Sequence, residues 1–281
     1  MAATDIYHIV GSLTPSRHAA KFIATADQAV VIDGFAETRV SAGDTTGTFT
    51  AWIMVPDITG DYGIISCGDT AAIEFLTLRV TAGKLVVELN DATADKFEHT
   101  SANIVITPHR WYHVAVTHNA GTDPLKLYVD GKRVDQTQTL GTDNSLWFAA
   151  LALTDDASIG AAEEAGAAAQ IREFKGAISD VKYWKVELTD AQILSDFNGK
   201  APATITGTTA DLTDWWDFKD DYVNSVTSAN NGTAGASILL MNEYSQFSSR
   251  FAFTAGTPLS ADNVTMSIKD EEGHAIIIKA T

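Results

Sequence analysis

Acidic side chains are the residues of this sequence whose spacing could indicate catalysis. Glycoside hydrolysis requires two carboxyl groups close together, one acting as general acid and the other as nucleophile or base. On a β-strand, a spacing of two residues places such a pair on one face. Glu74 in AIEFL and Glu88 in KLVVELN lie in apolar, strand-like runs, and neither has an acidic partner two residues away. The sequence therefore predicts that the chain is not an enzyme, with a hydrolase acting through Glu74 or Glu88 as the less favoured hypothesis.

Three histidines lie close together in the sequence and could be considered as metal ligands. His109 precedes a predicted strand, and His113 and His118 are an odd number of residues apart within it. An unbroken strand would point His113 and His118 to opposite faces, so a shared metal site would need a bulge. We interpret them as structural or exposed histidines. The sequence also lacks a Ser-His-Asp spacing, a phosphate-binding loop and a cysteine-rich metal pattern.

The elements that would position functional residues are predicted to be strands. In the stretch from Trp111 to Gln136, the residues Tyr112, Val114 and Val116 alternate with others, as in a strand with one buried face. A second run ends at Asp130-Gly131, a dipeptide typical of a two-residue hairpin turn. Similar short strands recur along the chain with almost no helix, which favours an all-β antiparallel sandwich.

Several segments, in the expected order, resemble the laminin-G-like (concanavalin A-like) jelly roll. They are FTAWIMV (Phe49–Val55), WYHVAVTH with LYVDGK after it, ASIGA (Ala157–Ala161), and FKGAISDVKYWKVELTDAQILSDFNG (Phe174–Gly199). The resemblance covers Lys21 to Lys200. It implies a two-sheet antiparallel jelly-roll sandwich that binds glycans or proteins. It does not imply an enzyme, because one fold carries many functions.

The chain is predicted to have three parts: an N-terminal arm (1–20), the jelly-roll domain (21–200) and a small C-terminal β module (201–281). Within the last part, DLTDWWDFKDD is similar to a segment that often opens laminin-G-like domains. It could pair with its own sandwich in permuted order, or begin a separate lobe. Val264–Lys269 and Ala275–Lys279 are predicted to form a hairpin.

Local signals predict several further elements. Thr189 and Gln192 have the spacing of a capping box, which predicts a helix after Thr189. Gly34–Gly47 and Thr137–Asn144 are predicted to be loops, Asn90–Ser101 is treated as a polar connection, and Asn103–Thr107 is predicted to be a strand that stops at Pro108.

Charge and composition narrow the classes of partner. The 281-residue chain has 19 Lys and Arg against 36 Asp and Glu, a formal net charge of -17. Binding to nucleic-acid phosphates or to an anionic membrane needs a basic surface, so we expect neither nucleic-acid binding nor membrane insertion. We interpret the acidic surface as solvated, although a cation or a basic protein partner is compatible with it.

The single cysteine and the N-terminal residues bear on where the protein works. Cys67 alone cannot form an intramolecular disulfide, and MAATDIYHIVGSL lacks the basic and long apolar regions of a signal peptide. Many laminin-G-like domains are secreted and carry disulfides. We therefore expect a virion component synthesised in the host cytoplasm, with other virion proteins or a second copy of the chain as partner. The apolar run AIIIKAT at the end of the sequence supports pairing within the module or with a neighbour.

The resemblance also directs attention to calcium and to sugar-stacking aromatics. Related domains often hold calcium through loop carboxylates, and the candidates are Asp61 and Asp69, and Asp155 and Asp156. No recognised calcium loop is present, so the predicted cofactor is none, with calcium as the alternative. The aromatic candidates for glycan binding, near predicted loops, are Tyr62, Trp147 and Phe148, although packing is the favoured interpretation of each.

The sequence thus predicts a structural and adhesive protein without enzymatic activity. Our main hypothesis is a virion protein, in a capsid decoration, tail or fibre, whose laminin-G-like domain meets host-surface glycans. The alternative is a carbohydrate-binding module of a cellular surface protein.

Overall fold

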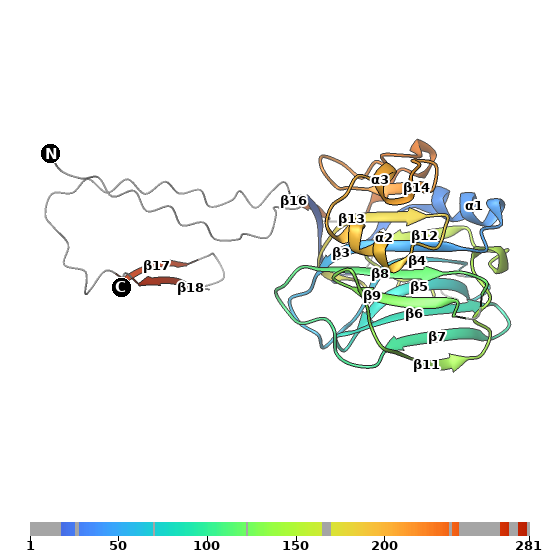
Figure 1. The fold of residues 1–281 in the computed structure, drawn as a ribbon, viewed down its shortest axis with the longest axis horizontal. Helices are drawn as coiled ribbons and strands as arrows, with labels where there is room; N and C mark the ends of the chain where they lie inside the picture. Colours follow the sequence, from blue (N-terminus) through green and yellow to red (C-terminus); the bar gives the residue numbers. More distant parts are fainter. Residues whose placement is uncertain are drawn as a thin grey trace, which may run out of the picture. The chain divides into compact units, whose positions relative to one another are not determined.

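The computed structural model describes residues 18–25, 28–69, 71–121, 123–164, 170–235 and 238–241, and the backbone of strands 265–269 and 275–279. The chain divides into two units, one of residues Ser16–Tyr244 and one of residues Met1–Pro15 with Ser245–Thr281. The larger unit is a sandwich of two antiparallel sheets, which confirms the predicted fold class (Figure 1).

The first sheet of the sandwich, sheet A, contains the strands that the sequence analysis predicted most clearly. Its strands are β1 (Ala19–Ile23), β3 (Gly47–Met54), β8 (Tyr112–His118), β9 (Leu125–Val129), β10 (Lys132–Arg133), β13 (Lys175–Trp184), β14 (Leu212–Trp216) and β16 (Leu239–Met241). The order is β10-β9-β8-β3-β13-β1-β16, and β14 also pairs with β13. All of these pairings are antiparallel.

The second sheet, sheet B, faces the inner side of sheet A. Its strands are β2 (Val30–Val31), β4 (Asp61–Asp69), β5 (Glu74–Thr81), β6 (Lys84–Asp91), β7 (Asp95–Ser101), β11 (Gln136–Gly141), β12 (Asp156–Ile159) and β15 (Thr233–Ala234). The order is β11-β7-β6-β5-β4-β12-β2-β15. In β6, Leu85, Val87 and Leu89 belong to the hydrophobic core, and the alternate side chains point outward.

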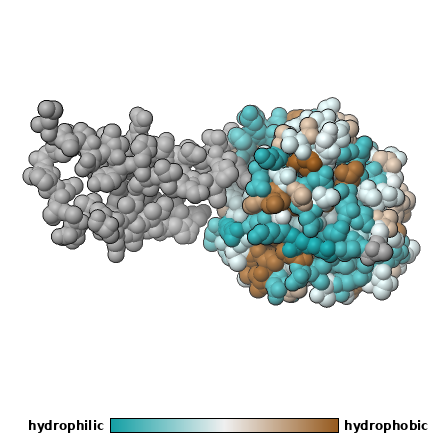
Figure 2. All heavy atoms as spheres, in the orientation of Figure 1, coloured by the Kyte–Doolittle hydropathy of each residue, from teal (hydrophilic) through white to brown (hydrophobic). Residues whose placement is uncertain are grey.

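Aromatic side chains from sheet A, from a helix and from a 3-10 turn meet in the core. Phe35 contacts Phe49, Phe148, Tyr183 and Trp216, with ring centroids 5.3 to 6.0 Å apart in edge-to-face arrangements. Such arrangements suit the charge distribution of aromatic rings. The surface, in contrast, is mostly polar on the face drawn in Figure 2, with apolar side chains in separate patches.

The helix that carries Phe35 is a correction to the sequence analysis. The prediction of a loop over Gly34–Gly47 is wrong for α1 (Asp33–Ala42), which is helical and ends at Gly43 in the left-handed conformation. No side chain caps its N-terminus. The helix is held by burial of Phe35, Ala36 and Arg39, so tertiary packing overrides the missing local signal.

The second helix follows its sequence signal closely. In α2 (Asp190–Phe197), Thr189 accepts the backbone N–H of Gln192, and the Gln192 side chain accepts the backbone N–H of Thr189, which confirms the capping box. Three shorter helices complete the described helical segments: α3 (Pro202–Thr206) and the 3-10 turns η1 (Phe148–Ala150) and η2 (Ser228–Asn230).

Three predictions for polar segments of sheet B and its surroundings are wrong. The stretch 104–107 is not a strand, whereas β7 and β11 are strands where a polar connection and a loop were predicted. Strand β11 forms the edge of sheet B, and most of its residues are exposed. Because neither face of β11 is buried, its sequence lacks the alternation of apolar and polar residues that would predict a strand.

The region after Lys200 contributes directly to the sandwich. Val181 of β13 pairs with Trp216 of β14, and β16 pairs with β1. In the second unit, β17 (Thr265–Lys269) and β18 (Ala275–Lys279) pair antiparallel, as predicted for a hairpin, and the predicted turn between them lies outside the described residues. Residues 1–17, most of the predicted arm, also lie outside them, and the predicted domain boundaries stay a prediction.

Candidate functional site

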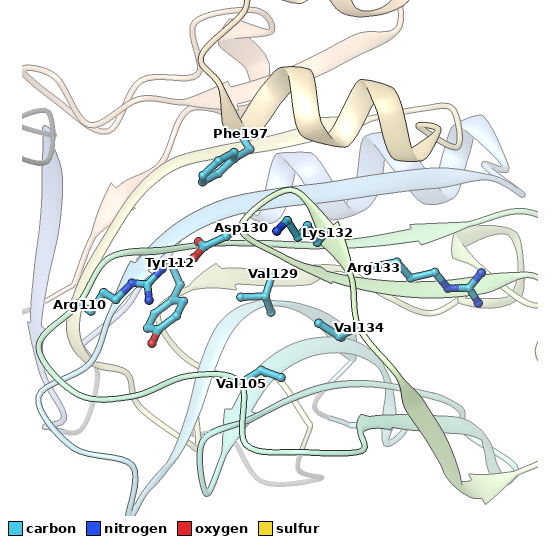
Figure 3. A pocket seen from close by; sticks show the side chains of 9 residues that line it. All are labelled: Val105, Arg110, Tyr112, Val129, Asp130, Lys132, Arg133, Val134 and Phe197. Atoms are coloured by element: carbon cyan, nitrogen blue, oxygen red, sulfur yellow. Dashed lines mark hydrogen bonds and ion pairs between the residues drawn. The ribbon is translucent and has the colours of Figure 1, made fainter.

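A shallow cavity of about 580 Å3 opens beside the turn between β9 and β10 (Figure 3). Strands β8, β9 and β10 of sheet A supply four lining residues, and Asp130 and Val134 flank β10. The segment before β8 supplies Val105 and Arg110, and the end of α2 supplies Phe197. We call this cavity the turn pocket. Its lining residues are Val105, Arg110, Tyr112, Val129, Asp130, Lys132, Arg133, Val134 and Phe197.

The Asp130-Gly131 turn explains why a carboxylate stands in this pocket. Asp130 and Gly131 have φ of +50° and +74°, as a type I′ hairpin turn requires of its two central residues. The Asp130 carboxylate accepts the backbone N–H of His113 at 3.1 Å and Arg110 Nη2 at 2.5 Å. The Arg110 guanidinium in turn lies 4.6 Å from the centroid of the Tyr112 ring. The carboxylate is therefore held in one orientation.

The charged side chains of the pocket differ in their availability. The Arg110 side chain contacts Asp130 but is still 61% exposed. Lys132 is exposed and makes no ion pair with any described residue. Arg133 points away from the pocket in Figure 3 and pairs with Asp123 at 2.7 Å. Hydrogen-bond donors and an acceptor thus stand beside an apolar floor of valines. This combination can bind a molecule with hydroxyl groups on one side and C–H groups on the other.

A buried ionic network fixes the helix that forms the opposite wall. Phe197 stacks on Trp52 with ring centroids 5.5 Å apart. The neighbouring Asp196 contacts His113 Nε2 at 3.0 Å and Lys182 Nζ at 2.9 Å. Burial alone would raise the pKa of Asp196, but the charge of Lys182 and the hydrogen bond from His113 hold it well below its usual range.

The three aromatic residues predicted to bind glycans do not line this pocket. Trp147 and Phe148 are 1% and 0% exposed, and Trp147 stacks on His118 and donates Nε1–H to the Tyr183 hydroxyl. Tyr62 is 6% exposed and donates its hydroxyl to Asp57 at 2.6 Å. Burial, with the Asp57 contact, raises the pKa of Tyr62 to about 12. The favoured interpretation, packing, describes all three rings in this structure.

The carboxylates of two predicted calcium ligands, Asp61 and Asp69, are engaged in other contacts. Asp61 accepts Arg172 at 2.8 Å, and Asp69 accepts the backbone N–H groups of Ala71 and Ala72 in a turn. Asp155 and Asp156 contact β4 through their backbones. The Asp155 N–H donates to the Gly68 carbonyl, and Asp156 of β12 pairs with Gly68 of β4. Within the described ranges, no group of three or more His, Cys, Asp or Glu residues could hold a metal ion.

The two acidic residues considered for catalysis have different surroundings. Glu74 accepts the backbone N–H groups of Leu153 and Thr154 at 2.7 and 3.0 Å and closes a loop. Glu88 does have a carboxyl partner, Glu98, directly opposite on β7, and Arg79 contacts both. A spacing of two residues along one strand does not reveal this pair, because the two residues lie on neighbouring strands.

Comparison with known proteins gives a family and a set of similar folds. The family model described as the concanavalin A-like lectin/glucanases superfamily matches residues 26–194. No curated protein matches the chain. Within the described ranges, no helix has the length and apolar character needed to cross a membrane.

Three solved structures illustrate the similarity of fold. The CBM40 of the Ruminococcus gnavus IT-sialidase, bound to alpha2,3 sialyllactose, is 14% identical, with a TM-score of 0.52 over 63% of this chain and 97% of that chain. A proposed carbohydrate-binding protein from Bacteroides ovatus ATCC 8483 is 18% identical, with a TM-score of 0.52 over 80% and 60%. The leech intramolecular trans-sialidase is 16% identical, with a TM-score of 0.52 over 67% and only 29%.

Proposed function

The chain belongs to the concanavalin A-like lectin/glucanases superfamily, and we propose that it is a glycan-binding protein without enzymatic activity, with its sugar site in the turn pocket. The observation that carries the proposal is the fixed Asp130 carboxylate, which stands between the exposed cations of Arg110 and Lys132 beside an apolar floor. A pyranose presents both hydroxyl groups and an apolar face, and this pocket is complementary to both.

Each part of the pocket has a defined task in this proposal. Asp130 accepts hydrogen bonds from sugar hydroxyls, and Arg110 and Lys132 donate to ring or hydroxyl oxygens. Val129 and Val134 pack against the apolar face of the sugar, and Phe197 closes one side. Because Asp130 is already held by two hydrogen bonds, little conformational freedom is lost on binding, which favours affinity.

The similar folds support the alternative context for glycan binding better than the virion context. Two of the three structures described above are carbohydrate-binding modules or proteins by their own descriptions. We therefore propose a carbohydrate-binding module of a cellular protein. Capsid decoration, a tail or fibre role and a virion location stay predictions from the sequence, as does assembly with a second copy.

A glycan array with the full-length chain, followed by calorimetric titration of the best ligand, tests the proposal. Asp130→Asn keeps the size of the side chain and tolerates the positive φ, but removes the charge that orients Arg110. We expect it to weaken binding at least tenfold, and Lys132→Ala to weaken it several-fold. Asp220→Asn, at an exposed acidic residue that does not line the pocket, serves as the matched control.

Two results would contradict the proposal. Saturable glycan binding that is equally strong in wild type and Asp130→Asn would place the site elsewhere on the sandwich. Release of sugar products on long incubation, abolished by Glu88→Gln, would instead support the hydrolase hypothesis.

A further inference from the structure

Two glutamates face each other on the outer surface of sheet B, away from the turn pocket. Glu88 of β6 and Glu98 of β7 are directly opposite in the register of the two strands. Their neighbours Val87 and Phe97 belong to the core, so both carboxyl groups point away from it. Like charges directly opposite each other destabilise a pair of strands, so this arrangement requires compensation.

Part of the compensation comes from one guanidinium group. Arg79 of β5 contacts Glu88 through Nη1 and Glu98 through Nη2, both at 2.6 Å. The three side chains are only 7%, 10% and 15% exposed, so water screens their charges poorly. One positive charge can balance one of the two carboxylates.

A segment from outside the sheet buries this region further. Residues 160–164 and 170–174, which we call the crossing segment, lie beside β4, and Ala161 and Glu163 lie over its outer face. The backbone N–H of Glu163 donates to Ser66 Oγ at 3.0 Å. Gly63 and Gly68 make room, because a Cβ on them would lie 2.6 Å from Ala161 C and 2.0 Å from Glu163 O. The crossing segment thereby brings another acidic residue, Glu164, to the group.

The charges around Glu88 do not balance. Arg172 contacts Asp61 and Glu164, each at 2.8 Å, and Arg79 Nε lies 3.5 Å from Asp61. Two guanidinium groups thus face four carboxyl groups. The charged groups around Glu88 are Arg79 on β5, Glu98 on β7, Asp61 on β4, and Glu164 and Arg172 on the crossing segment. Lys84 lies on the same face of β6 and makes no ion pair with a described residue. Lys96 lies on the same face of β7 and is paired with Asp91.

We propose that Glu88 and Glu98 form a proton-binding site, which holds one proton between the two carboxyl groups of the folded chain near neutral pH. The proton resides on Glu88, which donates it in a hydrogen bond to Glu98, while Glu98 stays ionised on Arg79. The bound proton removes one negative charge from the group described above. The site is independent of the proposed glycan pocket.

The pKa values of the two carboxyl groups shift in opposite directions, which agrees with this geometry. Burial raises the pKa of Glu88 to about 7, and the charge of Arg79 only partly offsets it. Burial also acts to raise the pKa of Glu98, but hydrogen bonds from Thr139 and Arg79 and the charge of Arg79 lower it. A carboxylic acid beside a carboxylate is the usual result of such a split.

Proton binding makes the stability of the fold depend on pH. The folded pKa of Glu88 lies above its usual value of 4.5, so the folded chain binds more protons than the unfolded chain between these values. The stabilisation is fully present below pH 4.5 and is lost as the pH rises through about 7. The new charge then repels Glu98 and Glu164, so the crossing segment is weakened together with the strands.

Carboxyl carbon NMR of the full-length chain, labelled at glutamate, tests the proposal directly. We expect one glutamate to titrate near pH 7 and its signal to be missing in Glu88→Gln. In Glu98→Gln the same titration should move to lower pH, because a neighbouring negative charge has been removed. The exposed Glu37→Gln is the matched control and should leave it unchanged.

Thermal unfolding provides a second and independent measurement. Between pH 5 and pH 7.5 we expect the Tm of the wild type to fall by roughly 5 °C more than that of Glu88→Gln, which stays neutral throughout. The proposal is overturned if no glutamate titrates above pH 6, or if Glu88→Gln and Glu37→Gln show the same dependence of Tm on pH.

Discussion

Trp147 contributes to this protein through packing. Its indole stacks on His118, with centroids 4.8 Å apart and an interplanar angle of 3°, and meets Phe49 and Phe148 in the core. Burial lowers the pKa of His118, so the neutral imidazole is favoured in this stack. The ring therefore links the end of β8 to the aromatic centre of the sandwich.

The first prediction concerns this tryptophan. Trp147→Ala should lower the free energy of unfolding by about 3 to 5 kcal/mol, because it leaves a large cavity and removes the hydrogen bond that the Tyr183 hydroxyl accepts. Denaturant unfolding followed by circular dichroism measures the change. Glycan affinity of the fraction that stays folded should be unaltered, and a selective loss of affinity at full stability would restore Trp147 as a binding residue.

Asp196 carries the second prediction. Asp196→Asn leaves Lys182 buried with Asp180 as its remaining carboxylate, at a cost of roughly 3 kcal/mol at pH 7. The folded pKa of Asp196 lies below its usual 3.8, so its stabilisation is present above that pH and is lost as the pH falls further. Urea unfolding between pH 7 and pH 2.5 should show wild type and variant converging at low pH. The exposed Asp220→Asn is the control, and parallel curves would contradict the assignment.

Single residues show which parts of the site the sequence could and could not reveal. The Asp130-Gly131 turn and the Thr189 capping box were predictable, because their geometry is determined by residues adjacent in sequence. Glu88 could not be paired with Glu98 from the sequence, since their contact depends on the register of two strands. The pocket role of Arg110 and Phe197 depends on the approach of two distant segments in the same way.

At the scale of elements, β4 has small outward-facing residues that leave room for the crossing segment. Its outward positions carry Gly63, Ser66 and Gly68, which are small enough to let backbone approach the sheet. The sequence does not predict that the crossing segment approaches β4, because glycine in a strand also marks bulges and bends. The same limit applies to α1, whose N-terminus has no side-chain cap and whose formation depends on contacts across the core.

Gly68→Ala gives the third prediction. Because the new Cβ would lie 2.0 Å from the Glu163 carbonyl oxygen, the crossing segment must shift, at a cost of about 1 to 3 kcal/mol. Chemical denaturation measures the loss, and hydrogen exchange should locate it at Glu163 and Ser66. Gly199→Ala is the control for backbone strain, because its φ is +71° but a Cβ there meets nothing within 4 Å. Unchanged stability of Gly68→Ala, with unchanged exchange at Glu163 and Ser66, would show that crowding over β4 is not limiting.

At the scale of the whole molecule, the sandwich includes residues of the predicted C-terminal β module. Trp216 of β14 is fully buried, contacts Phe35 and donates its Nε1–H to the Asn230 carbonyl at 3.0 Å. Asp214 accepts Asn224 Nδ2 at 2.8 Å and Asn230 Nδ2 at 2.6 Å, which closes the loop after β14. The resemblance left two alternatives for this segment, pairing with its own sandwich or a separate lobe, and β14 pairs with β13 of the sandwich.

The last prediction follows from these contacts and uses two truncations. A chain of residues 1–241 retains β14 and β16 on sheet A, whereas a chain of residues 1–200 leaves β13 without β14 and opens the core at Phe35. We expect the longer truncation to give a cooperative unfolding transition and a monodisperse peak in light scattering, and the shorter one to aggregate. A folded monomer of residues 1–200 would show instead that the jelly roll is complete without β14. The mass of the full-length chain in light scattering then tests assembly. If the full-length chain is an oligomer while residues 1–241 are a monomer, the residues after Met241 join the copies. If both are monomers, the predicted homo-oligomer is wrong.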